Sequence, residues 1–239
     1  MRIALIHAVT VAIAPVHEAF ARLWPAAECI DILDTSLSLD RERDGELTPA
    51  MTRRIGALAD YAAATGADGI LYTCSAFGEA IEAAAAASAL PVLKPNEAMF
   101  EAALAQGERI GMLATFGPSV TGMEDEFRQM AAATGSGARI ETICVSEAMA
   151  ALKAGDGATH DRLLAEAAPR LEKCDAVLLA HFSTSRAESA VRAALPCPVL
   201  TAPGAAVERL KALLSGYFRA ADLRRRPSSG ATASGGNFE

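Results

Sequence analysis

The stretch Asp68-Gly69-Ile70-Leu71-Tyr72-Thr73-Cys74 has a counterpart 107 positions later, Asp175-Ala176-Val177-Leu178-Leu179-Ala180-His181. The same offset relates two further pairs of segments, Arg2-Ile3 to Arg109-Ile110 and Pro91-Val92-Leu93 to Pro198-Val199-Leu200. One offset shared by three separated pairs indicates that the chain contains two related halves. Six positions after each aspartate stands a side chain that can transfer a proton, Cys74 in the first half and His181 in the second.

Short apolar runs alternate with longer alanine-rich stretches, a pattern typical of an α/β fold with a mainly parallel sheet. Four strands are expected in each half, at 3–7, 29–33, 69–73 and 92–93 and at 110–114, 140–145, 176–180 and 199–201. Helices are expected at 48–65, 78–88, 97–106, 118–134, 159–173, 185–195 and 204–221. We therefore predict two pseudo-symmetric, Rossmann-like halves with an active site in the cleft between them.

The two halves are expected to exchange segments, so that residues 1–97 plus 205–224 form the first half and residues 98–204 form the second. The charged segment 36–46 lacks an apolar period and is predicted to be a loop, either a lid over the cleft or an exposed connection. Residues 227–239 are rich in Ser, Gly and Ala and are predicted to be a disordered tail.

The composition excludes several classes of protein. A net charge of −7 offers no basic face for nucleic acid. No uncharged apolar stretch reaches the roughly 18 residues that a membrane span needs, and no segment resembles a secretory signal. The five cysteines form no CxxC pair and no zinc pattern, which favours free thiols in a reducing cytoplasm. Motifs for nucleotides, metals and pyridoxal phosphate are absent from the sequence, so no cofactor is expected.

Cys74 is expected at the junction between a buried strand and a helix, where parallel sheets place their ligands. The positive end of the helix dipole should lower the thiol pKa from its free value of about 8.5. The neighbouring Thr73, Ser75 and Ala76 can offer hydroxyl and N–H groups to a carboxylate or enolate oxygen. The alternative interpretation is an inert cysteine buried at a strand end.

His181 occupies the same junction in the second half and can give or take a proton at neutral pH. A structural histidine is the alternative. The remaining candidate substrate-binding residues lie at strand ends of both halves: His7, Thr115, Phe116, Ser119, Phe182 and Ser183. Thr115 and Ser119 fit an oxyanion site or an ordinary helix cap equally well. His17 and His160 are expected at the surface. Basic residues are scarce at these loops, with Lys94 the exception.

On these residues the chain resembles the aspartate/glutamate racemase superfamily, which also contains hydantoin racemases, maleate isomerases and arylmalonate decarboxylases. Thr73-Cys74-Ser75-Ala76 is similar to the first cysteine motif, and Ala180-His181-Phe182-Ser183 stands where a second, usually Gly-Cys-Thr, is found. The resemblance covers about residues 1–220. It implies two α/β halves with the active site between them. It also implies that histidine replaces the second catalytic cysteine here.

The resemblance and the paired residues together predict a cofactor-independent racemase or isomerase that acts at the carbon next to a carboxylate. Cys74 is expected to be the main acid/base, and His181 the opposing acid/base or a hydrogen-bond donor. Three alternatives remain: an arylmalonate-type decarboxylase, a Cys–His hydrolase and a small-anion binding protein without turnover. The expected partner is a small carboxylate, and alanine-rich helices make a homo-oligomer reasonable.

Overall fold

The structure is a computed structural model that describes residues 1–225, so the predicted tail at 227–239 lies outside the described residues. The chain forms two four-stranded sheets in which every pairing is parallel. The first has the order β2(Glu28–Leu33), β1(Arg2–His7), β3(Gly69–Tyr72), β4(Val92–Leu93). The second has the order β6(Arg139–Cys144), β5(Arg109–Ala114), β7(Ala176–Leu179), β8(Val199–Thr201). The predicted fold class is confirmed.

The internal repeat has a physical cause at the start of the two central strands of each sheet. The carboxylate of Asp68 accepts the backbone N–H of Arg2 at 2.8 Å, and the carboxylate of Asp175 accepts that of Arg109 at 2.8 Å. Each aspartate thereby holds one central strand beside the other. The buried central strands β1, β3, β5 and β7 keep the offset of 107, whereas β2 and β6 are shifted by 111 positions. One edge strand of each sheet, β2 or β6, therefore drops out of the sequence repeat, whereas the opposite edge strands β4 and β8 keep the offset of 107.

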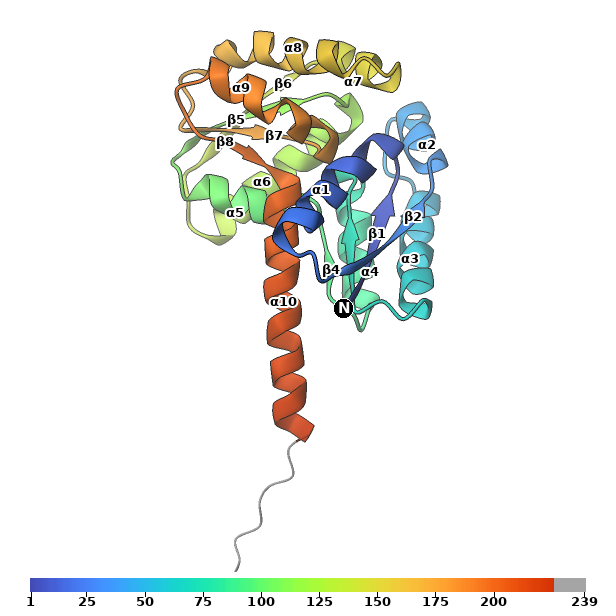
Figure 1. Ribbon diagram of the computed structural model, residues 1–239. Coiled ribbons are helices and arrows are strands. Elements are labelled where there is room, and N and C mark those ends of the chain that lie inside the picture. The colour runs from blue at the N-terminus through green and yellow to red at the C-terminus, as the bar shows by residue number, and fades with distance from the viewer. Residues whose placement is uncertain (226–239) are drawn as a thin grey trace, which may run out of the picture.

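The helices form layers on both faces of each sheet (Figure 1). A core shared by the two halves contains side chains of both sheets and of four helices: α1(Ile13–Leu23), α5(Glu97–Leu104), α6(Val120–Ala133) and α10(Ala202–Arg225). Two further cores lie on the other faces of the sheets. One involves α3(Pro49–Ala64) and α4(Gly78–Ala87), and the other involves α8(Gly157–Ala167) and α9(Glu188–Ala194). In the described residues no helix is long and apolar enough to cross a bilayer.

The last helix, α10, follows a strand of the second sheet but packs against the first half. A Cβ on Gly69 of β3 would lie 3.1 Å from Leu214 and 3.4 Å from Leu210 of α10. Lys211 of α10 also donates to the carbonyl of Leu23 at the end of α1, at 3.0 Å. This packing agrees with an exchange of segments between the halves, while the limits at 97 and 205 stay predictions.

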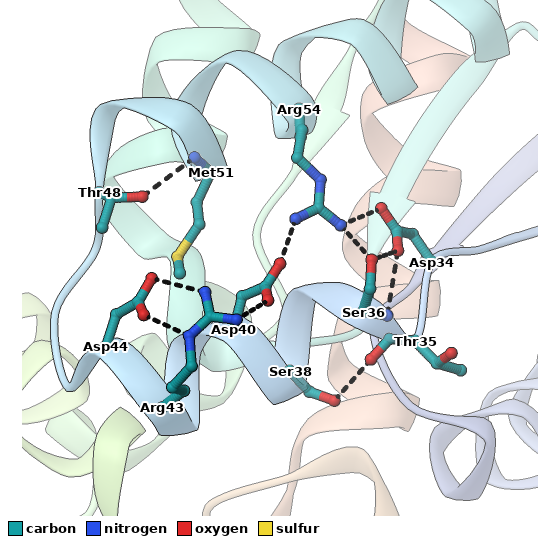
Figure 2. Close-up of polar contacts among 10 residues, drawn as sticks. All are labelled: Asp34, Thr35, Ser36, Ser38, Asp40, Arg43, Asp44, Thr48, Met51 and Arg54. Atoms are coloured by element: carbon teal, nitrogen blue, oxygen red, sulfur yellow. Dashed lines mark hydrogen bonds and ion pairs between the residues drawn. The ribbon is translucent and has the colours of Figure 1, made fainter.

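The expectation of a loop at 36–46 is wrong, because this segment contains the helix α2(Ser36–Asp44). Only Leu37 of this helix is buried, so the sequence shows no apolar period. Figure 2 shows that α2 is held by polar contacts instead. Arg54 of α3 binds Asp40 and Asp34, each at 2.6 Å, and also contacts Ser36. Gly45, with a φ of +72°, ends the helix.

Besides α2, two further helices were absent from the sequence prediction. In α1, Pro15 lies within the first turn, where its missing N–H breaks no helical hydrogen bond, but it obscures the helical pattern. The other helix, α7(Ser146–Lys153), has eight residues, of which only Ala148 and Met149 are buried. A short helix therefore follows the edge strand β6 in the second half, just as α2 follows the edge strand β2 in the first.

Candidate active site

Cys74 and His181 occupy equivalent places in the two sheets. Each lies two positions after the end of a central strand, β3 or β7, and directly precedes a short 3-10 helix, Ser75–Phe77 or Phe182–Ala187. Both residues line one pocket. Parallel strands expose their carboxyl ends at one edge of a sheet, so this pocket lies where ligands of such sheets bind. The structure thus brings the two repeat-related residues together.

The pocket wall contains seven of the predicted residues: Thr73, Cys74, Ser75, Phe116, His181, Phe182 and Ser183. Four others lie behind or beside it. His7 is fully buried and contacts Thr73, while Thr115 and Ser119 contact His181. The backbone N–H of Ala76 is hydrogen-bonded to the thiol of Cys74. These four residues can support the wall but do not themselves line this pocket.

The thiol of Cys74 is held in its protonated form. Burial raises its pKa to about 11, and the hydrogen bond from Ala76 N–H and the charge of Arg41 offset only part of this effect. The expectation of a lowered pKa is therefore wrong. A 3-10 turn of three residues separates Cys74 from the first residue of α4, so Cys74 is not within the first turn of that helix, where the dipole acts most strongly.

The imidazole of His181 is neutral and has both nitrogens engaged. Ser119 Oγ donates to the carbonyl of Phe116 at 2.8 Å, which leaves its lone pairs to accept from His181 Nε2 at 2.9 Å. Nδ1 then accepts from the backbone N–H of Thr115 at 3.4 Å and faces its hydroxyl at 3.3 Å. Burial, and secondarily the nearby His160, lower the pKa of His181 to about 4.

The backbone of His181 is fixed as well. Thr184 Oγ1 donates to the His181 carbonyl at 2.6 Å and accepts the His181 N–H at 3.1 Å. The ring therefore lies in a defined position in the pocket that Cys74 also lines. To take a proton from a substrate, Nδ1 must give up its two long contacts with Thr115.

On the first wall, a chain of polar contacts runs from the surface to the pocket. His17, with 40% of its side chain exposed, contacts the carboxylate of Asp31 at 2.9 Å. Asp31 also contacts Nε2 of buried His7 at 3.0 Å, and Nδ1 of His7 contacts Thr73 Oγ1 at 2.8 Å. Burial lowers the pKa of His7, and the neighbouring Asp31 opposes this only in part. The other histidine expected at the surface, His160, is fully buried, so that expectation is wrong.

Sequence reasoning missed the pocket residues Val9, Ala12, Ser38, Met149 and Lys153. Ser38 comes from α2 and the last two from α7, the short helices that the apolar pattern did not reveal. Lys153 is the one cation on this wall within the described residues, and its Nζ lies 3.7 Å from Glu42 of α2. Lys94, the expected basic residue, instead pairs with Glu82 at 2.6 Å and Glu126 at 2.8 Å away from this wall.

Arg41 of α2 connects the two halves just outside the pocket. Its Nε donates to the carbonyl of Ala76 at 3.3 Å, and its Nη2 donates to that of Pro118 at 3.0 Å. The first carbonyl follows β3 and the second follows β5, so one guanidinium fixes the distance between the two loops. Within residues 1–225, no three His, Cys, Asp or Glu side chains converge as a metal site would require.

Comparison with known proteins identifies the family. A sequence model described as Asp/Glu/Hydantoin racemase matches residues 9–180. The chain belongs to this family. The fold agrees with membership: an allantoin racemase from Klebsiella pneumoniae has a TM-score of 0.65 at 17% identity, with 98% of this chain and 97% of that chain covered.

Two further racemases have similar folds. A glutamate racemase, isoform RacE1, from Bacillus anthracis has a TM-score of 0.71 at 14% identity, with 90% of this chain and 82% of that chain covered. An aspartate racemase from Picrophilus torridus has a TM-score of 0.70 at 12% identity, with 90% and 94% covered. No curated protein sequence is a significant match. The resemblance to the racemase superfamily is confirmed, whereas the replacement of a second cysteine by His181 stays a prediction.

Proposed function

We propose that the protein is a cofactor-independent racemase or isomerase that acts at the carbon next to a carboxylate, with proton transfer by Cys74. The observation that carries this proposal is one pocket that is lined by both Cys74, from the first half, and His181, from the second. Membership of the racemase family supports it. Chemistry on both faces of one carbon requires groups on two facing walls, and the two halves of the repeat supply one group each.

The state of the two groups suggests the order of events. At neutral pH Cys74 is a thiol, because its pKa is raised to about 11, so it is ready to protonate an enediolate from its side of the pocket. His181 is a neutral imidazole, and its Nδ1 becomes the base on the other side if it releases Thr115. In the reverse direction the thiolate of Cys74 removes the proton.

The rest of the pocket favours a carboxylate with an apolar part. The apolar wall is formed by Val9, Ala12, Phe116, Met149 and Phe182. Lys153 provides a positive charge for a carboxylate. Ser75 Oγ is buried and has no hydrogen-bond partner among the described residues, so its hydroxyl is available to an enediolate oxygen. With these donors in place, the proposal needs no cofactor.

The test is a screen of chiral acids, hydantoins and substituted malonates in heavy water, followed by NMR. We expect deuterium at the carbon next to the carboxylate, together with loss of optical rotation. Cys74→Ala should lower the rate by ~10²–10⁴-fold, the contribution of a placed acid/base group. The matched control is Cys144→Ala, since Cys144 is an exposed free thiol outside the pocket. Full turnover by Cys74→Ala would refute the proposal.

Decarboxylation of a substituted malonate is a second candidate that one observation favours. Both nitrogens of His181 are occupied, and Cys74 carries a proton, so the resting site has one proton donor and no free base. A decarboxylase needs only a donor, because loss of carbon dioxide itself generates the enediolate. Release of carbon dioxide with protonation on one face would distinguish this reaction from racemisation.

The two remaining alternatives make different demands. A Cys–His hydrolase needs a hydrogen bond between Cys74 and His181, but the partners of His181 in the described residues are Thr115, Ser119 and Thr184. A binding protein without turnover would bind carboxylates in the screen without deuterium exchange. We further propose a cytoplasmic location and a small carboxylate as the partner. A homo-oligomer stays a prediction.

A further inference from the structure

The hydrogen-bonding groups around His7 have only one consistent arrangement of protons. The hydrogen bonds to His17 and His7 outweigh the effect of burial and lower the pKa of Asp31, which is therefore an ionised acceptor. The Nε2 atom of His7, 3.0 Å from Asp31, must then carry the ring proton. Neutral His7 consequently has a bare Nδ1, which accepts the hydroxyl proton of Thr73 at 2.8 Å.

The hydroxyl of Thr73 has a single proton and two neighbouring acceptors. Nδ1 of His7 lies at 2.8 Å from Thr73 Oγ1, whereas the carbonyl of Ile6 lies at 3.4 Å, too far to compete well for this proton. The lone pairs of Thr73 Oγ1 are then available to the pocket that Thr73 lines beside Cys74. Thr73 is thus an acceptor toward the pocket while His7 is neutral.

We propose that Asp31, His7 and Thr73 form a proton relay that ends at the pocket wall beside Cys74. This inference rests on the proposed function, because the relay serves the proton chemistry of Cys74. Thr73 is the residue that touches the contents of the pocket. His7 and Asp31 are positioning residues that act through it.

The proton transfer balances as follows. A proton leaves Cys74 and reaches Thr73 Oγ through a water molecule, and its electron pair stays on sulfur as the thiolate. A new O–H bond forms on Thr73 while its original hydroxyl proton passes to Nδ1 of His7. His7 becomes an imidazolium whose charge is balanced by Asp31, and Thr73 now presents its O–H to the pocket. The reverse sequence returns the proton to Cys74.

The surroundings of His7 allow this change of charge. The titratable groups that face it are Asp31 on β2 and His17 on α1. Thr73, the residue after β3, contributes its hydroxyl. Cys29, also on β2, stays neutral, because burial and the charge of Asp31 raise its pKa to about 11. Asp34, whose N–H binds the His7 carbonyl, is already paired with Arg54 at 2.6 Å. The carboxylate of Asp31 is therefore the counter-ion for His7.

The relay is tested first without any substrate, by NMR of the full chain with ¹⁵N-labelled histidine. We expect His7 to carry its proton on Nε2 at pH 8. Thr73→Val removes a donor to the neutral ring and should raise the pKa of His7, and Thr73→Ser should restore it. Asp31→Asn should lower this pKa. The matched control is Thr142→Val, because Thr142 Oγ1 is buried without a partner in the described residues. A proton on Nδ1, or equal pKa values in Thr73→Val and Thr142→Val, would overturn the relay.

The second arm uses deuterium exchange into an acid that the wild type turns over. Thr73→Val and His7→Gln should lower kcat by roughly 10²-fold with little change in KM. In the wild type, protonation of His7 at acidic pH blocks the relay and lowers kcat, so both variants should lose this decline. Unchanged kcat and pH profile in both variants would overturn the relay and leave the proposed function intact. If no candidate acid exchanges with wild type while the NMR results hold, the proposed function fails and the hydrogen-bonded chain stands.

Discussion

The raised pKa of Cys74 makes a quantitative prediction about alkylation by iodoacetamide. Only the thiolate reacts, and with a pKa of about 11 it amounts to about 10⁻⁴ of Cys74 at pH 7. A free cysteine with a pKa of about 8.5 is about 3% ionised at this pH. We therefore expect Cys74 to react roughly 300-fold more slowly than free cysteine. The rate should increase tenfold per pH unit up to about pH 10, as long as the pH stays below the pKa.

The measurement is the loss of the unmodified Cys74 peptide by mass spectrometry between pH 6 and pH 10. The exposed Cys144 is an internal control for reagent activity and for folding. Slow reaction alone could reflect restricted access to the pocket, so the pH dependence decides the outcome. If the alkylation rate of Cys74 levels off at or below pH 8.5, burial does not raise the pKa of this thiol. The lowered pKa expected from the sequence would then be correct.

Three further predictions concern the support of the site. Ser119→Ala removes the acceptor of the buried His181 Nε2–H and should lower the free energy of unfolding by about 1–3 kcal/mol, measured by urea titration. An unchanged free energy of unfolding would contradict the neutral Nε2–H tautomer. Arg54→Met breaks two partly exposed ion pairs of about 1 kcal/mol each at most, so amide exchange should accelerate in residues 36–44 and stay unchanged in residues 157–167. Hydrogen bonds from Arg109 lower the pKa of Asp175 in the folded protein. The Asp175 carboxylate therefore stabilises the fold above the pKa of an unfolded aspartate, about 3.9, and this stabilisation is lost as the pH falls through the pKa of Asp175 in the folded protein. Asp175→Asn should therefore weaken the dependence of unfolding on pH between pH 5 and pH 2, and a dependence equal to that of wild type would contradict the role of this carboxylate.

The two walls of the pocket differ in how they hold a proton. On the first wall Cys74 carries one, and Thr73 connects it to a buried histidine with a carboxylate counter-ion. On the second wall His181 is fixed between Thr115 and Ser119, and no carboxylate of residues 1–225 contacts its ring. A reaction that protonates one face more readily than the other is the expected consequence. Measuring which enantiomer gains deuterium first would reveal this asymmetry directly.

The sequence alone determined the two halves, the eight strands and the places of Cys74 and His181. Buried parallel strands are continuous apolar runs, and a repeated run fixes which residues end equivalent strands. The apolar period of the sequence does not reveal the helix α2, because this helix is held by the ion pairs of Arg54 with Asp34 and Asp40 rather than by apolar contacts. Ser38 on α2 was missed as a pocket residue for this reason, and Lys153 was missed because α7 is short and buries only two residues.

Only the tertiary structure decided the protonation of the site. The pKa of Cys74 depends on burial by elements far away in the chain, and no local pattern reports that burial. The partners of His181 come from 62 and 66 positions earlier, and the partner of His7 is 66 positions later. A side chain's identity is fixed by the sequence, but its charge is set by the groups and the dielectric that folding places around it.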